Sequence, residues 1–365
     1  MNRNAATTNF RRKGRPLVPM WILASCCATT ALAQTTPLPS PTAADPALHL
    51  TSDAGTQDFA SARHFLQLGK YDEAITQLLA LQSRNPAPPG LSRELGVAYY
   101  KKSDFLNAAK FLSAALSENS HDEEATQLLG LSYYLAGRPA QAIPRLEKVQ
   151  TWYPSANVDA SYILGICYIQ TKDYRHAREA FGKMFAVAPD SAASYLFTAR
   201  MLLRQDFGPI AEEYAGKAVS LDPKLPLAHE LLGELYLYQS KIPEAIAQFD
   251  AELAINPGYA TAYYKLADAQ SRLQQYDDAE KLLQRSLWLD STSTGPYILL
   301  GKILEKKGEA ELSARALQRA LAMDPSNPIP HHLLGQTYRD LGRTDDAERE
   351  LKLAEQLQFQ QNEKP

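Results

Sequence analysis

His229 and Glu230 are the first residues to consider for chemistry, because a His-Glu pair on a helix opens the motif of the zinc proteases. That motif needs a second histidine four residues after the first, and Gly233 stands there instead. The metal would lack a ligand. His331 and His332 are the only adjacent histidines among seven. We therefore expect no metal site and no metal cofactor in this chain.

Acidic residues in pairs could serve general acid and base chemistry, and three such pairs occur. Each precedes an apolar, helix-like stretch, where the positive end of the helix dipole favours negative charge. Capping the helix is thus the simpler interpretation. The pairs are Glu123-Glu124, Asp277-Asp278 and Asp345-Asp346. The chain also lacks Gly-x-Ser-x-Gly, a phosphate-binding loop and Cys-x-x-Cys, so we expect no catalytic residue, no cofactor and no enzyme activity, with a hydrolase as the least favoured alternative.

Cysteine is sparse, with three residues in 365. Cys26 and Cys27 lie in an N-terminal segment that resembles an export signal, which leaves Cys167 alone in the remainder. A single cysteine cannot form an internal disulfide. We expect Cys167 to be buried as part of the core, with a reactive thiol as the alternative.

Regular spacing of small residues organises most of the chain. A Gly or Ala returns every 34 residues, with one gap of 35, at Ala62, Gly96, Gly130, Gly165, Ala199, Gly233, Ala267, Gly301 and Gly335. An apolar residue follows sixteen positions later, at Leu78, Leu112, Leu146, Phe181, Ala215, Phe249, Leu283, Leu317 and Leu351. Nine matches in register indicate a repeat protein.

Each unit has the pattern of two short helices joined by a turn. The turn 68–72, for example, contains Gly69 where the first helix would end and Asp72 where the next would begin. Proline closes six of the units and cannot continue a helix. A single helical hairpin would leave an apolar face in water, so its stability must come from stacking on its neighbours.

The order of small, aromatic, Ala, apolar and Pro columns over 34 residues resembles the tetratricopeptide repeat family. Gln270 and Ser313 depart from its aromatic and Ala columns. The resemblance implies an all-α, right-handed solenoid of about nine helix-turn-helix repeats over residues 55–361. Its units would start near 55, 89, 123, 158, 192, 226, 260, 294 and 328.

The resemblance also implies a binding groove lined by the first helix of each unit. Its inward positions lie three residues before the small residue and one, four and five after it. The predicted partner-binding residues are Arg93, Tyr100, Lys101, Tyr134, Tyr162, Ile166, Arg200, Arg204, Glu234 and Tyr264. Tyr and Arg carry much of the binding energy in interfaces. The alternative is that Tyr134 and Tyr162 only pack between neighbouring first helices.

We expect this groove to hold a protein or peptide. Replacing Arg200 and Arg204 by Glu should then weaken capture of the partner without lowering the melting temperature. The second functional hypothesis is a glycan- or peptidoglycan-binding accessory protein. Self-association is an alternative use of the same groove. The formal charge of -3 and the absence of a basic stripe argue against nucleic acid.

The N-terminal segment predicts export. Basic residues at 11–15 precede an apolar stretch and the small-residue motif Ala31-Leu32-Ala33, so residues 1–33 read as a signal peptide with a mature N-terminus at Gln34. Leu23-Ala24-Ser25-Cys26 also resembles a bacterial lipoprotein motif, in which lipid on Cys26 would anchor the protein to a membrane. Residues 34–54 are rich in Pro and Thr and read as a linker. The expected location is the periplasm or outside the cell.

Overall fold

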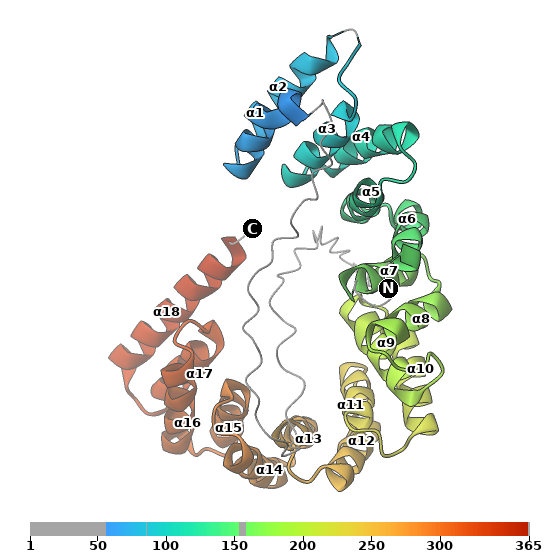
Figure 1. The fold of residues 1–365 in the computed structure, drawn as a ribbon. Coiled ribbons are helices and arrows are strands. Elements are labelled where there is room, and N and C mark those ends of the chain that lie inside the picture. Colours follow the sequence, from blue (N-terminus) through green and yellow to red (C-terminus); the bar gives the residue numbers. More distant parts are fainter. Residues whose placement is uncertain (1–55, 85, 153–157, 364–365) are drawn as a thin grey trace, which may run out of the picture. The chain divides into compact units, whose positions relative to one another are not determined.

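The computed structural model describes residues 56–84, 86–152 and 158–363. The expected signal peptide, Cys26, the linker 34–54 and the start of the first unit at 55 lie outside these residues. Across the described ranges the secondary structure is eighteen α-helices, arranged as nine hairpins that follow one another along the chain (Figure 1). The predicted all-α solenoid of helix-turn-helix repeats is therefore confirmed.

The first helices of the hairpins carry odd numbers. They are α1 (Thr56–Gln67), α3 (Leu91–Lys101), α5 (Glu123–Leu135), α7 (Val158–Gln170), α9 (Ala192–Arg204), α11 (Ala228–Tyr238), α13 (Ala260–Arg272), α15 (Thr294–Lys306) and α17 (Pro328–Asp340). The second helices are α2 (Tyr71–Gln82), α4 (Phe105–Glu118), α6 (Pro139–Trp152), α8 (Tyr174–Met184), α10 (Gly208–Leu221), α12 (Ile242–Ile255), α14 (Tyr276–Leu289), α16 (Ala310–Met323) and α18 (Thr344–Glu363).

Packing within each hairpin depends on the two columns seen in the sequence. Gly130 lies so close to Leu146 that a Cβ built on the glycine would stand 2.8 Å from Leu146 Cδ2. Leu146 and seven of its eight counterparts in the same column are fully buried, whereas Leu351 in the last unit is half-buried. The small residue thus lets the two helices approach, and the large one fills the space between them.

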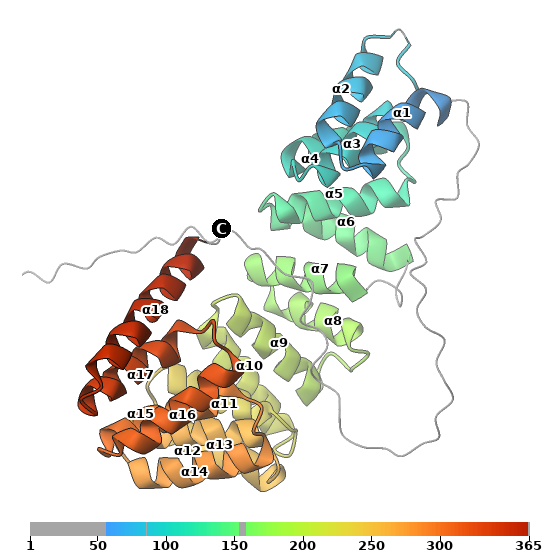
Figure 2. The ribbon, with the colours of Figure 1, turned by 90° about the vertical axis from the view of Figure 1, so that its left-hand side faces the viewer.

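Neighbouring hairpins contact each other through two kinds of helix pair. Every second helix packs on the first helix that follows it, and first helices also contact one another, as in α1 with α3, α3 with α5 and α13 with α15. Figure 2 shows α5 and α6 side by side, with α7 and α8 following as the next hairpin. The core is consequently a series of apolar clusters shared by neighbours, the largest of which runs from α6 to α11, as expected for a repeat array.

The turns inside the nine hairpins share one backbone geometry. In each, a residue with positive φ follows the first helix, and it is Gly at only four of the nine: the residues are Gly69, Ser103, Gly137, Lys172, Asp206, Ser240, Gln274, Gly308 and Gly342. In the turn at Gln274, for instance, the backbone N–H of Gln274 donates to Ser271 O (2.9 Å), and the backbone N–H of Gln275 donates to Gln270 O (3.0 Å). These paired bonds form a Schellman motif, which satisfies the last carbonyls of the helix.

Acidic pairs stand at helix starts, as predicted. Glu123 and Glu124 open α5, and the other two pairs lie in the first turns of α14 and α18. The cap itself is often the preceding residue, since the side chain of Asp122 accepts a hydrogen bond from Ala125 N at 2.8 Å. Ser313, the departure from the Ala column, is buried and donates to Gly301 O at 2.8 Å.

Candidate partner-binding surface on the first helices

The four predicted groove columns differ sharply in their accessibility. Five residues after the small residue, in the last turn of every first helix, the side chain is exposed in all nine units. We call this column the last-turn row; it consists of Gln67, Lys101, Leu135, Gln170, Arg204, Tyr238, Arg272, Lys306 and Asp340. The other three columns are mostly half-buried or buried, because they face the first helix of a neighbouring unit.

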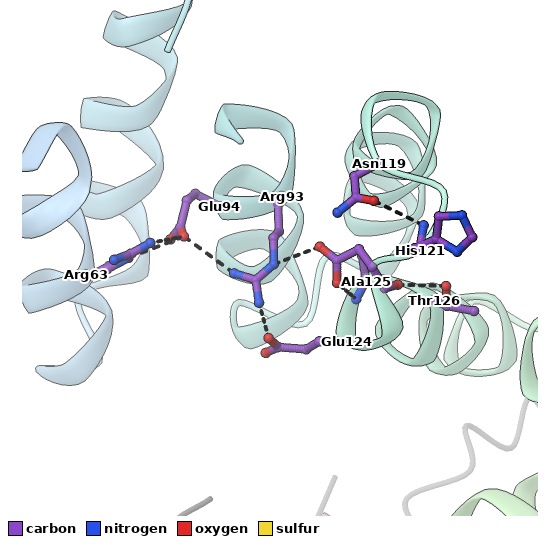
Figure 3. Close-up of polar contacts among 9 residues, drawn as sticks. Arg63, Arg93, Glu94, Asn119, His121, Glu124, Ala125 and Thr126 are labelled. Carbon is purple, nitrogen blue, oxygen red and sulfur yellow. Dashed lines mark hydrogen bonds and ion pairs between the residues drawn. The ribbon is translucent and has the colours of Figure 1, made fainter. Parts of the chain in front are cut away.

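Ion pairs between successive first helices occupy much of the predicted groove. Arg63 of α1 donates to Glu94 of α3 at 2.6 Å, and Glu94 is 6% exposed. Arg93 lies 3.6 Å from the same carboxylate, donates to Asp122 at 3.0 Å and also contacts Glu124. Figure 3 shows Arg63, Glu94, Arg93 and Glu124 as one chain of contacts across three helices. Arg93, predicted to bind a partner, is thus already paired within the protein.

Arg200 belongs to a second network of this kind. It donates to Glu230 of α11 at 3.0 Å, and Glu230 is 5% exposed. Tyr259 donates to the same carboxylate at 3.3 Å. A buried carboxylate that loses its cation is costly. In place of the unchanged melting temperature expected from the sequence, this contact predicts that reversing the charge of Arg200 lowers stability.

Glu234, another predicted binding residue, is also paired. Its carboxylate contacts Lys265 of α13. Burial lowers the pKa of Lys265, whereas the charge of Glu230 acts in the opposite direction. The two acids of α11 and the cations of α9 and α13 therefore neutralise one another across three units.

The four predicted groove tyrosines are half-buried between neighbouring elements. Tyr100 meets Phe105 edge-on with ring centroids 5.8 Å apart, and Tyr162 lies 6.4 Å from Phe181. A Cβ on Gly295 of α15 would stand 3.3 Å from the Tyr264 hydroxyl oxygen. Burial raises the pKa of Tyr100 and Tyr264 and, with Tyr162 and Cys167 nearby, that of Tyr134. Packing between units is thus one role of these rings.

Ile166 is a correction to the sequence analysis. It is 1% exposed and belongs to the apolar cluster of α7, against which Tyr134, Tyr162 and Leu203 pack. Helix α7 is apolar on nearly all sides, so its neighbours cover the position that would face outward in other units. In this structure Ile166 is a core residue, and no partner could reach it.

Lys101 and Arg204 are the predicted binding residues that remain open. Both side chains are exposed, and neither side chain makes an ion pair or hydrogen bond within the part of the chain that the structure describes. Their column also contains Tyr238, which is 80% exposed and was missed by the sequence analysis. The same spacing that selected Arg204 selects Tyr238, one unit further along.

The histidines singled out for metal chemistry serve packing. His229 is 9% exposed, with Nδ1 2.7 Å from Gln248 Oε1 and Nε2 3.0 Å from the Pro223 carbonyl oxygen. His331 repeats this arrangement three units later, against Glu350 and the Pro325 carbonyl. Among the described residues, no group of three His, Cys, Asp or Glu side chains could hold a metal ion.

Cys167 is buried, as predicted, with 0% of its surface exposed. Burial raises the pKa of its thiol to about 12. The thiolate is the reactive form of cysteine, so this environment favours the core interpretation over a reactive thiol.

Two open clefts lie beside second helices. The larger, of about 570 Å³, is lined by residues of α6, α7 and α8 that include Glu147, Tyr168 and His176. Tyr168 donates a hydrogen bond to Glu147 and stacks on His176 at 5.3 Å between centroids. Burial, and then the bond to Glu147, raise the pKa of Tyr168, so its proton is held firmly.

None of the described helices is both long and apolar enough to cross a lipid bilayer.

Comparison with protein families gives matches along most of the described chain. Models of the tetratricopeptide repeat match residues 59–123, 230–296, 295–327 and 316–349. The model of anaphase-promoting complex, cyclosome, subunit 3 matches residues 100–184.

Curated relatives share the repeats at low identity. The chain is 26% identical to BBSome complex member BBS4 of Bos taurus over 256 residues, which is 70% of this chain and 49% of that protein. It is 29% identical to the chloroplastic tetratricopeptide repeat domain-containing protein PYG7 of Arabidopsis thaliana over 106 residues, 28% of this chain and 35% of the relative. It is 23% identical to TPR repeat-containing protein MJ1428 of Methanocaldococcus jannaschii over 273 residues, 70% and 48% of the two chains. The chain thus spans about half the length of these relatives, or less.

Solved structures with local similarity include MamA from Desulfovibrio magneticus RS-1, residues 41 to the end, at 21% identity and a TM-score of 0.44. That match covers 47% of this chain and 97% of MamA. Another is YrrB, described as a TPR protein with an unusual peptide-binding site, at 23% identity and a TM-score of 0.42. It covers 50% of this chain and 93% of YrrB.

Proposed function

Because the chain belongs to the tetratricopeptide repeat family, we propose that it is a non-catalytic protein-protein interaction scaffold of the bacterial envelope. It holds a partner protein or peptide against the first helices of its repeats. The observation that carries this proposal is the last-turn row, where nine successive units expose the side chain at one column while neighbouring columns are used in packing. A repeat fold alone does not give a function, so the accessible side chains must carry the argument.

Charge on the last-turn row favours a partner that offers carboxylates. Four of its members are basic, and two of these have acidic neighbours: Arg272 donates to Asp268 at 2.9 Å, and Lys306 lies 3.9 Å from Glu305. Lys101 and Arg204 have no such neighbour among the described residues. Exposed ammonium and guanidinium groups gain charge-assisted hydrogen bonds when a partner's carboxylate reaches them.

Tyr238 would supply the apolar part of the contact. Its ring is 80% exposed at the end of α11, one unit after Arg204 in the same row. Tyrosine loses little conformational freedom on binding and buries a large area, which is why it is enriched at interface hot spots. A segment crossing units five and six would meet Arg204 and Tyr238 together.

The envelope location rests on the N-terminal sequence alone. The basic cluster, the apolar stretch and Ala31-Leu32-Ala33 support export, and the Cys26 motif supports a lipoprotein as the alternative. Mass spectrometry of the mature N-terminus separates the two, since it would find either Gln34 or a lipidated Cys26.

Affinity capture with a charge-reversed row tests the binding function. The full chain carrying Lys101→Glu and Arg204→Glu would be compared with the wild type for proteins that crosslink to it in its native envelope. Loss of the captured partner at an unchanged melting temperature is expected. Lys183→Glu with Lys217→Glu, on exposed positions of second helices, is the matched control. Equal capture by the row variant and the wild type, or capture of polysaccharide in place of protein, would refute the proposal.

A further inference from the structure

Exposed basic and aromatic side chains occur on the second helices of units seven and eight, at positions that do not belong to the last-turn row. Helices α14 and α16 contribute Lys281, Arg285, Trp288, Arg315 and Arg319, which we call the outer basic patch. All five side chains are exposed, and Trp288 is 73% exposed. The patch uses neither the predicted groove columns nor the two clefts.

Trp288 is unusual for its place in the repeat. It stands 21 residues after the small residue, a position that holds Ser83, Ser117, Thr151, Ser220, Ala254 and Ala322 in other units. Stacking of the hairpins therefore does not need a large ring at this position. The Arg285 guanidinium lies 4.3 Å from the centroid of Trp288 and 5.9 Å from that of Tyr263, which positions the indole without covering it.

The charges of the patch run against helix stability. Lys281 and Arg285 are four residues apart on α14, as are Arg315 and Arg319 on α16. Like charges at this spacing repel each other and weaken a helix. In units four and five the same two columns hold Glu179 with Lys183 and Glu213 with Lys217, in the order that stabilises a helix. Units seven and eight thus each have two cations where units four and five have a stabilising Glu-Lys pair, and the result is a cationic surface.

Partners for these cations are scarce within the protein. Lys281 donates to Asp278 at 3.1 Å, but both side chains are largely exposed, so the pair is weak. The side chains of Arg315 and Arg319 make no ion pair or hydrogen bond with any residue that the structure describes. Their guanidinium groups are therefore available for bidentate bonds to carboxylates.

We propose that the outer basic patch is a second docking surface, which binds an acidic segment of a partner protein. Carboxylates of that segment pair with Arg315 and Arg319, and an adjacent apolar side chain packs on the indole of Trp288 beside Arg285. Together with the last-turn row, this surface would let one chain hold two different partners at once.

The surroundings of the patch favour a short acidic segment over an extended polyanion. Exposed acids flank it in the first turns of the same helices, at Asp277, Asp278 and Glu311, and the whole chain has a formal charge of -3. A membrane surface or a nucleic acid would place its phosphates against these acids as well as against the arginines. A peptide can instead place its few carboxylates on the arginines alone.

Selection from a random peptide library displayed on phage tests the proposal with the full chain as bait. Peptides that bind the wild type but not Arg315→Glu with Arg319→Glu should be enriched in Asp or Glu next to a large apolar residue. A synthesised peptide from that set should bind the double variant, and Trp288→Ala, about tenfold or more weakly. Its binding should also change the fluorescence of Trp288, and this change should be missing in Trp288→Ala.

Matched controls separate this surface from general charge effects. Lys183→Glu with Lys217→Glu changes the charge equally on the same column of units four and five, and it should leave the affinity unchanged. The melting temperatures of the patch variants should match that of the wild type, since the substituted side chains are exposed. The control variant loses two Glu-Lys pairs at i,i+4 spacing and should melt slightly below the wild type while it still binds the peptide. The proposal is overturned if no acidic motif is enriched or if the control pair weakens binding equally. It is also overturned if vesicles containing phosphatidylglycerol bind through the same arginines while the peptides do not.

Discussion

Gly165 of α7 lies against the ring of Phe181 of α8, so close that a Cβ built on the glycine would stand 2.5 Å from the Cε1 atom. The same relationship joins the glycine and the apolar residue sixteen positions later in five other units, with the nearest atom at 2.6–2.8 Å. Phe181 is fully buried. In these six hairpins the distance between the two helices is therefore set by the absence of a single methyl group.

Gly165→Ala should destabilise the protein by about 1–3 kcal/mol, because the ring must move within a close-packed core. Urea unfolding measures this loss. Gly216→Ala in α10 is the control, since a Cβ there meets no other atom within 4 Å. That substitution should stabilise the helix by up to about 1 kcal/mol. If both variants had the same stability, contact with Phe181 would not determine the spacing.

The positive φ of the turn residues predicts opposite changes in stability when glycine is introduced and when it is removed. Gln274 has φ of 61° and Gly308, its counterpart in the next unit, has φ of 78°. Gln274→Gly should raise the free energy of unfolding by about 1 kcal/mol, because glycine adopts this conformation without steric cost. Gly308→Gln should lower it by a similar amount. Thermal melts of the two single variants should move in opposite directions, and a shift of the same sign in both would contradict the assignment of a left-handed turn residue.

The repeat period was enough to predict the helices, the small and apolar columns and the burial of Cys167. Those features follow from spacing within one hairpin. Ile166 and Arg200 were misjudged because their burial and their partners depend on side chains of the next unit, which a column does not specify. The turns at Ser103 and Lys172 could not be identified from composition either, since the backbone there takes the left-handed conformation without glycine.

Arg200 and Arg204 should differ in what their replacement changes. Arg200→Ala leaves Glu230 buried without its guanidinium, so we expect a loss of about 1–3 kcal/mol in the free energy of unfolding. Arg204→Ala removes an exposed side chain and should change stability by less than about 0.5 kcal/mol. Denaturant unfolding of the two variants decides the point, because equal stabilities would mean that the contact with Glu230 contributes nothing.

Cys167 gives a pH dependence with a definite sign. Burial raises the pKa of its thiol to about 12 in the folded chain, whereas the pKa is about 8.5 in the unfolded chain. The folded state therefore binds more protons in this range, and stability falls as the pH rises from about 8.5 towards 12. Buried tyrosines add to the fall at high pH, so the comparison should be with Cys167→Ala, which lacks the thiol contribution. A parallel pH profile in the two proteins would argue against this effect.

Site-specific photocrosslinking tests the central claim most directly. A photoreactive amino acid would replace Tyr238 in the last-turn row of the full chain, and Lys217 of α10 in a second variant, before irradiation in the native envelope. The scaffold account predicts a defined protein adduct from position 238 that disappears when Lys101→Glu and Arg204→Glu are added, with no such adduct from position 217. No protein adduct at 238, or the same adduct from both positions, would contradict it.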